Sequence, residues 1–253
     1  MSVLGKCRLC LREHRELQNS HFMSAAIHKV CRSRNIEPIA LDGRSLRPTH
    51  GQMVDRLLCS FCEQRFTQRG EDWTIKNMAR RSEFPIQNCL KRAKAMQTHR
   101  EFAAQSIPGV DTDKLAYFAI SIFWRASVHQ WFDSEANQPI ETISLGKYKE
   151  PLRRFLIDGA TWPTDVLLFI SIWPWPNPPL TFQVPSHKER NGLKSFQFRI
   201  PGLTFDLTPR SIAPVNLGRE YPDSVIFIET TKIWFPANWK SRVATWMPWK
   251  HCK

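Results

Sequence analysis

The sequence has no run of apolar residues close to the 18 that a membrane-spanning helix needs, so we expect no membrane span. The first ten residues, MSVLGKCRLC, lack the apolar stretch of a secretory signal, and we therefore expect a cytoplasmic protein. Serine-triad, P-loop and dinucleotide-binding motifs are also missing, which argues against those classes of enzyme. There is no internal repeat or low-complexity tract, and an apolar content of 42% excludes a wholly disordered chain.

Acidic residues are scarce relative to basic ones. The 253 residues include 36 Lys and Arg but 23 Asp and Glu, so the net charge is +13. The excess is concentrated in residues 1–104, where 19 basic residues stand against 10 acidic ones. A charge of this size favours a polyanionic partner, most commonly nucleic acid, although a basic surface without a dedicated ligand would give the same count.

Seven cysteines are present, and four of them form two CxxC pairs, Cys7 with Cys10 and Cys59 with Cys62. Two thiolates at this spacing can hold one side of a tetrahedral ion, and a second pair completes its shell, so we predict a structural Zn²⁺ site. The odd count and the missing export signal argue against disulfides. The other cysteines are interpreted as buried or free thiols: Cys31, Cys89 and Cys252.

Capping residues and hydrophobic periodicity predict helices in five places: residues 25–31, 62–75, 87–105, 113–132 and 147–157. The helix over 87–105 would carry a basic face. Runs rich in β-branched and aromatic residues predict five strands: Val166–Trp173, Thr181–Val184, Phe196–Ile200, Leu203–Leu207 and Val225–Ile228. Residues 32–54 are polar and are predicted to form a loop.

The segment Ser106–Gly109 is the best candidate for a domain boundary, because the composition changes after it. Nine of the ten tryptophans follow residue 120. Core packing explains them best, although exposed aromatic rings could also stack on bases.

His21 lies between the two CxxC pairs, and Glu63 directly follows the second pair. With the segments ELQNSHF (16–22) and LLCSFCEQRF (57–66), this order resembles the zinc-containing HNH, or ββα-metal, endonucleases. More narrowly, it is similar to a group of uncharacterised bacterial HNH-like proteins with the pattern CxxC…NSHxxP…LLCxxCExxF. The resemblance covers about residues 5–77 and does not extend to the remainder of the chain.

The resemblance implies a treble-clef or ββα-metal domain in which Zn²⁺ fastens a β-hairpin to a helix. His21 would act as the general base that activates water, and Glu63 would hold a catalytic Mg²⁺ or Mn²⁺. The arginines expected to contact flanking phosphates are Arg56, Arg65 and Arg69. Together with the composition, this predicts an α+β protein with a zinc domain over residues 1–105 and a tryptophan-rich α+β domain with a mainly antiparallel sheet over residues 106–253.

Three positions depart from the family pattern. Ser20 stands where the family has an acidic residue, Glu63 where asparagine is frequent, and Ser24 where proline is usual. A further anionic ligand could come from Glu71 or Asp72, but these lie ~12 Å along a regular helix from Glu63 unless the helix is interrupted at Gly70. Other roles remain open, since His21 could bond to backbone or contact a base, and Glu63 could complement the helix dipole.

Three functions are consistent with the sequence. The first is a metal-dependent HNH-type endonuclease that hydrolyses phosphodiester bonds in nucleic acid, for which we expect DNA. The second is a catalytically inactive, zinc-dependent module that binds DNA or RNA. The third is a protein-interaction platform built on the tryptophan-rich half.

Overall fold

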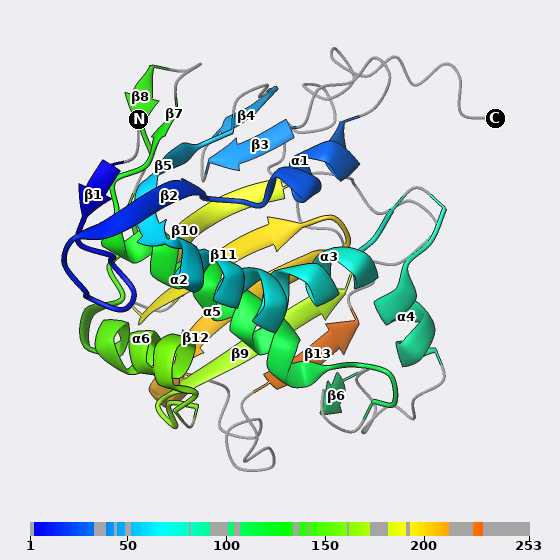
Figure 1. Ribbon diagram of the computed structural model, residues 1–253. Helices are drawn as coiled ribbons and strands as arrows, with labels where there is room; N and C mark the ends of the chain where they lie inside the picture. The colour runs from blue at the N-terminus through cyan, green and yellow to red at the C-terminus, as the bar shows by residue number, and fades with distance from the viewer. Residues whose placement is uncertain are drawn as a thin grey trace.

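The computed structural model combines two β-sheets with helices, which confirms the α+β class (Figure 1). The strands β7 (Phe132–Asp133) and β8 (Gln138–Pro139) pair with each other in a separate two-stranded sheet. The structure describes residues 3–32, 39–42, 45–48, 52–80, 82–91, 101–103, 107–133, 137–140, 142–160, 162–172, 182–190, 193–212 and 225–229.

The smaller sheet has three antiparallel strands in the order β1-β2-β5. They are β1 (Val3–Gly5), β2 (Arg15–His21) and β5 (Val54–Cys59). Helix α2 (Ser60–Phe66) begins directly where β5 ends. The strands β2 and β5 and the helix α2 thus form a ββα unit of the kind predicted for residues 1–105.

Helix α2 continues through a π-helical turn, Thr67–Glu71, into α3 (Asp72–Asn77), which confirms the helix predicted over residues 62–75. Gly70 lies in the turn, at the point of contact with α5 (Thr112–Val128). A Cβ atom on Gly70 would stand 2.7 Å from the backbone N of Phe118. The absence of a side chain at Gly70 therefore permits the two helices to touch backbone to backbone.

The larger sheet has eight strands in the order β4-β3-β10-β11-β12-β9-β13-β6. Their bounds are β3 (Ile39–Asp42), β4 (Ser45–Pro48), β6 (Glu101–Ala103), β9 (Val166–Ile172), β10 (Phe182–Arg190), β11 (Leu193–Ile200), β12 (Leu203–Pro209) and β13 (Val225–Glu229). Five of its pairings are antiparallel, and two, β3 with β10 and β9 with β13, are parallel. The prediction of a mainly antiparallel sheet is confirmed, and each of the five predicted strands is present.

Two predictions of local structure were wrong at the edges of this sheet. The loop predicted over residues 32–54 contains β3 and β4, which extend the sheet through the pairing of β3 with β10. Of the helix predicted over residues 87–105, the first part falls in α4 (Pro85–Leu90), residues 92–100 lie outside the described residues, and residues 101–103 form β6 instead. In both places the strand forms because it pairs with a strand far away in the sequence. Local residue propensities contain no information about such a partner.

Helix α5 lies between the α2–α3 helix and the larger sheet (Figure 1). Phe118 of α5 packs edge-on against Phe198 and Phe205 of the sheet, at ring centroid distances of 6.1 and 5.8 Å. On the other side Trp124 meets Phe66 of α2. These contacts explain why the helix predicted over residues 113–132 is apolar on nearly every face.

The remaining helices are short: α1 (Ala25–Cys31), α6 (Lys149–Asp158) and the 3₁₀ turns Gly146–Tyr148 and Arg210–Ile212. The helix predicted over residues 147–157 corresponds to α6. None of the helices in the described ranges is both long and apolar enough to cross a bilayer.

The predicted boundary at residues 106–109 lies within a shared structure. Strands β3, β4 and β6 precede it, yet they pair in the same sheet as the five strands that follow it. The buried apolar side chains form one continuous cluster that runs from Cys7 and Leu9 to Phe205 and Leu207. Residues 1–105 and 106–253 therefore share a sheet and a hydrophobic core.

Candidate metal centre and its basic surroundings

The two CxxC pairs are brought together by the ββα unit. Cys7 and Cys10 lie in the turn that follows β1, Cys59 ends β5, and Cys62 lies in the first turn of α2. The four Sγ atoms are all within 4.8 Å of one another, and those of Cys10 and Cys59 are 4.0 Å apart. Sulfur atoms around a tetrahedral Zn²⁺, with Zn–S bonds of ~2.3 Å, are about 3.8 Å apart. The cluster can therefore hold a metal ion.

Backbone hydrogen bonds fix this arrangement independently of any ion. The N–H of Arg8 donates to the carbonyl of Leu57 at 3.1 Å, which ties the first turn to β5. The N–H of Cys59 donates to the Sγ of Cys7 at 3.4 Å. Three of the four cysteines are buried and Cys10 is half-buried. With four thiolates on one tetrahedral ion no open position would remain, so the ion's role would be structural.

The four-cysteine cluster contains thiols whose pKa values are shifted in opposite directions. The hydrogen bond from Cys62 lowers the pKa of Cys7 to about 4, while the same bond and burial raise the pKa of Cys62. Burial also raises the pKa of Cys10. One sulfur is thus readily ionised, and its charge opposes ionisation of its neighbours. A divalent cation would remove this repulsion and replace the remaining protons.

His21 and Glu63 lie on neighbouring elements of the ββα unit. His21 is the last residue of β2 and is half-buried, and its Nδ1 atom is buried without a hydrogen-bond partner in the described part of the chain. The adjacent Ser20 is fully buried and donates its hydroxyl to Oε1 of Glu63. Ser20 also accepts a hydrogen bond from the N–H of Leu58 at 3.2 Å. Ser20 thus bonds directly to Glu63, the residue predicted to hold a catalytic metal.

Arg125 of α5 supplies a buried positive charge beside these carboxylates. Its Nη1 lies 2.8 Å from Oε1 of Glu71, and its Nη2 lies 4.0 Å from Oε2 of Glu63. The guanidinium packs over the ring of Phe66, 4.6 Å from the ring centroid, and the residue is 1% exposed. Burial raises the pKa of Glu63, and the charge of Arg125 and the Ser20 hydroxyl oppose that rise. Arg125 therefore supplies the positive charge that balances Glu63 and Glu71. Without it, these carboxylates would need another cation at the same place.

Glu71 ends the π-helical turn and contacts the same guanidinium as Glu63. The sequence predicted that these carboxylates are too far apart to share an ion unless the helix is interrupted at Gly70, and the helix instead continues through Gly70 as a π-helical turn. Both carboxylates contact the guanidinium of Arg125, and each contacts a different terminal nitrogen. Among the described residues, the four cysteines are the only group of three or more His, Cys, Asp or Glu side chains placed closely enough to hold a metal ion.

Sequence reasoning did not single out Arg125. Its signal is its position, since it is one charged residue within the apolar stretch from Leu115 to Ala126. Arginine is almost never fully buried without a partner. A charge at that point in a buried helix therefore indicates an acidic partner on the element packed against it.

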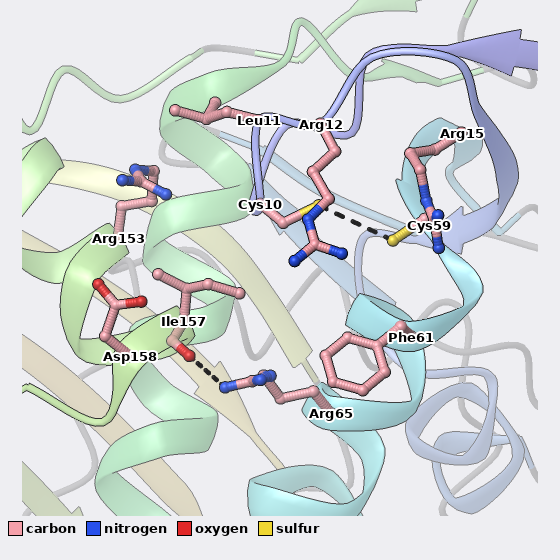
Figure 2. A pocket seen from close by; sticks show the side chains of 10 residues that line it. All are labelled: Cys10, Leu11, Arg12, Arg15, Cys59, Phe61, Arg65, Arg153, Ile157 and Asp158. Atoms are coloured by element: carbon pink, nitrogen blue, oxygen red, sulfur yellow. Dashed lines mark hydrogen bonds between the residues drawn. The ribbon is translucent and has the colours of Figure 1, made fainter.

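A cavity of about 570 Å³ lies beside the cysteine cluster (Figure 2). It lies between the turn that holds Cys10, the start of α2, and α6. Its lining residues are Cys10, Leu11, Arg12, Arg15, Cys59, Phe61, Arg65, Arg153, Ile157 and Asp158. Four of these are arginines, and a single carboxylate opposes them.

Two of the four arginines are held by protein groups. Nη1 of Arg153 donates to the carbonyl of Leu9 at 2.6 Å, and its other nitrogens pair with Glu150 at 2.8 Å. Arg65 donates to the carbonyl of Ile157 and lies over the ring of Phe61. These contacts tie α6 to the cysteine-bearing turn and to α2.

Arg12 and Arg15, by contrast, have no side-chain hydrogen bond or ion pair within the described part of the chain. Figure 2 shows the Arg12 guanidinium directed into the space between α6 and Phe61. A second hollow, of about 130 Å³, continues along α2 and shares Phe61 and Arg65 with the first. Its other lining residues are Gln64, Gln68 and Arg69.

Of the arginines predicted to contact phosphates, the structure places Arg65 and Arg69 together and Arg56 apart from them. Arg65 lines the larger cavity, and Arg69 lines the adjoining hollow. Arg56 lies on β5 and donates to the carbonyl of Leu17 at 2.8 Å, within the small sheet. Sequence reasoning missed Arg12, Arg15 and Arg153, whose common feature is their place around the Cys10 turn.

No protein-family model, curated protein or solved structure matches the chain. The resemblance to HNH endonucleases therefore stays a prediction from the sequence.

Proposed function

We propose that this protein binds nucleic acid through the arginine-lined cavity, and that Zn²⁺ in the four-cysteine cluster keeps the walls of that cavity in place. The observation that carries the proposal is the placement of Arg12 and Arg15, two arginines without a protein partner in the described residues, on one wall of a concave surface. Guanidinium groups bind phosphate oxygens in a bidentate manner, so such a surface suits a phosphodiester backbone.

The electrostatics of the cavity support an anionic ligand. A tetrathiolate that holds a divalent ion carries a formal charge of −2, and Asp158 adds one more negative charge. The four arginines carry +4, but Arg153 is paired with Glu150, so the remaining three balance that total and Arg12 and Arg15 face the cavity without a partner of their own in the described residues. The chain as a whole carries +13, which attracts a polyanion over longer distances.

Non-catalytic binding fits the surroundings of Glu63 better than metal-dependent hydrolysis does. Glu63 accepts the hydroxyl of Ser20 and lies beside the guanidinium of Arg125. A catalytic Mg²⁺ at this carboxylate would have to displace a buried arginine that also pairs with Glu71.

The test measures the binding of fluorescently labelled DNA and RNA by anisotropy between 50 and 200 mM salt. We expect affinity to fall steeply with salt, as it does when phosphates are neutralised. The double variant Arg12→Gln/Arg15→Gln should bind at least about tenfold more weakly, with the slope of log K against log salt reduced by about two.

The matched control is Lys149→Gln/Arg154→Gln, which removes two charges from exposed positions of α6 outside the lining of the cavity. It should keep most of the affinity. If both double variants lost the same amount of affinity, the binding would depend on a diffuse basic surface and not on the cavity. The proposal would then fail. It would fail equally if neither DNA nor RNA bound with salt dependence.

A metal-dependent endonuclease is the second candidate, and one observation favours it. His21 ends β2 beside the Ser20–Glu63 pair with an unpartnered Nδ1 atom, as a general base on a hairpin would. Supercoiled plasmid and branched DNA, incubated with Mg²⁺ or Mn²⁺ and then with EDTA, test this function. If the metal-loaded protein cuts, His21→Ala should abolish cutting while the exposed His14→Ala should not. If it binds without cutting, the binding function alone stands.

A further inference from the structure

The cavity is larger than a phosphate group requires. At about 570 Å³ it falls within the range of sites that enclose small organic ligands, ~300–1,000 Å³. A ligand that only neutralised the arginines would leave the apolar part of the wall, which includes Leu11, Phe61 and Ile157, in contact with water.

Phe61 is the most solvent-exposed apolar side chain in the lining of the cavity. It lies in the first turn of α2 and is 58% exposed, although it borders both the larger cavity and the smaller hollow. The guanidinium of Arg65 lies 5.2 Å from the ring centroid and is itself fixed by the carbonyl of Ile157. The ring is therefore supported on one side and accessible on the other, as a platform for stacking requires.

The charged and aromatic groups stand on different walls. Arg12 and Arg15 come from the Cys10 turn and β2, and Phe61 comes from α2 (Figure 2). A molecule that satisfied both walls would carry an anionic group at one end and a flat apolar face at the other. A nucleotide within a nucleic-acid chain has this composition, provided that its base is not already stacked and paired.

We infer that the cavity receives an unpaired nucleotide, whose base stacks on Phe61 while Arg12 and Arg15 hold the adjoining phosphates. This inference rests on the proposed nucleic-acid binding and specifies its substrate as single-stranded or locally unpaired nucleic acid. A base inside a duplex cannot present its face to a side chain without being unstacked, so a fully paired ligand would engage only the arginines.

The experiment compares a labelled single strand with a blunt duplex of the same sequence by fluorescence anisotropy at one salt concentration. The parent protein should bind the single strand at least about fivefold more tightly. Phe61→Ala should lose about 5–100-fold in affinity for the single strand, which is the size of one base–aromatic stack. Its affinity for the duplex and its salt dependence should stay unchanged, because no phosphate contact is removed.

Two further variants keep the test specific. Phe61→Trp retains a stacking surface, so it should keep the preference for the single strand, and its added tryptophan emission should be quenched when the strand binds. Phe132→Ala removes another exposed aromatic ring, on β7, and should behave as the parent does. Phe61 is exposed, so its replacement should leave the far-ultraviolet circular dichroism spectrum unaltered.

The outcomes separate this inference from the proposed function. If Phe61→Ala keeps the single-strand preference, or if the parent prefers the duplex, the inference is overturned while dependence on Arg12 and Arg15 can still support nucleic-acid binding. If the parent binds neither ligand, the proposed function fails and the inference fails with it.

Discussion

Arg125 compensates two carboxylates, and its removal would leave both of them half-buried without this cation. We predict that Arg125→Met destabilises the protein by about 3–5 kcal/mol at pH 7.5, the usual cost of breaking a buried ion pair from one side. Urea unfolding followed by tryptophan fluorescence measures this loss.

The loss should shrink as the pH falls. Burial raises the pKa of Glu63, and loss of the guanidinium would raise it further, so the penalty is present above that pKa and fades as the carboxyl is protonated. Adding Glu63→Gln and Glu71→Gln to Arg125→Met should restore part of the stability. A single variant as stable as the parent would show that the ion pairs contribute nothing.

His28 sets a second dependence on pH. It is 5% exposed, packs against the ring of Phe182 at 4.6 Å, and has an Nε2 atom without a hydrogen-bond partner in the described structure. Burial lowers its pKa to about 4, so the unfolded chain binds the proton more readily between pH 4 and 6.5. The stability that neutral His28 contributes is complete above pH 6.5 and is lost as the pH falls through that window.

We therefore predict that the parent protein loses about 2 kcal/mol more stability than His28→Leu does when the pH is lowered from 7.5 to 5. Urea midpoints at the two values measure the difference. His129→Gln, at a more exposed histidine, serves as the control. A parent and a leucine variant with parallel pH dependence would contradict the assignment.

At the scale of elements, the contact between the π-helical turn and α5 depends on Gly70. We predict that Gly70→Ala destabilises the protein by about 1–3 kcal/mol, because the new methyl group would meet the backbone of Phe118 and no rotamer can relieve the clash. Gln68→Ala, at an exposed position of the same turn, should change stability by less than about 0.5 kcal/mol. Thermal unfolding of the two variants side by side checks the prediction. If Gly70→Ala left the stability unchanged, α5 would have to move away from the turn to make room for the methyl group.

The elements that sequence predicted are those with a strong local signal. The apolar stretch of α5 and the β-branched run of β9 are nearly independent of context, so their positions were found. The strands β3 and β6 are short and pair with residues far along the chain, and no local pattern marks them.

The candidate site divides in the same way. Spacing alone identified the four cysteines, because the chemistry of a tetrahedral ion fixes that spacing. It could not find the Ser20–Glu63 hydrogen bond, which depends on how β2 packs against α2, or the ion pair of Arg125, which depends on how α5 packs against α2.

At the scale of the whole molecule, the four-cysteine cluster and the tryptophan-rich half belong to one core. We predict that removal of the metal, by a chelator or by Cys59→Ser, lowers the unfolding temperature reported by tryptophan fluorescence by at least about 10 °C. Nine of the ten tryptophans lie after residue 120, so this signal reports the half of the sequence that carries none of the four cysteines.

The control is Cys89→Ser, a half-buried thiol outside the cluster, which should keep both its metal content and its unfolding temperature. Elemental analysis of the pure protein should find about one Zn²⁺ per chain in the parent and in this control. A metal-free protein whose tryptophan transition stays at the parent's temperature would show that the two halves unfold separately.

The pairing of β3 with β10 has a consequence for how the chain is made. Ala40 lies beside Phe182 in this ladder, so β3 leaves the ribosome long before its partner is synthesised. At ~5–20 residues per second, the interval is on the order of ten seconds. Both cysteine pairs emerge within the first half of that time, whereas the hairpin of β3 and β4 keeps an unpaired edge until β10 is synthesised. During that interval the edge of β3 is open to pairing with other strands.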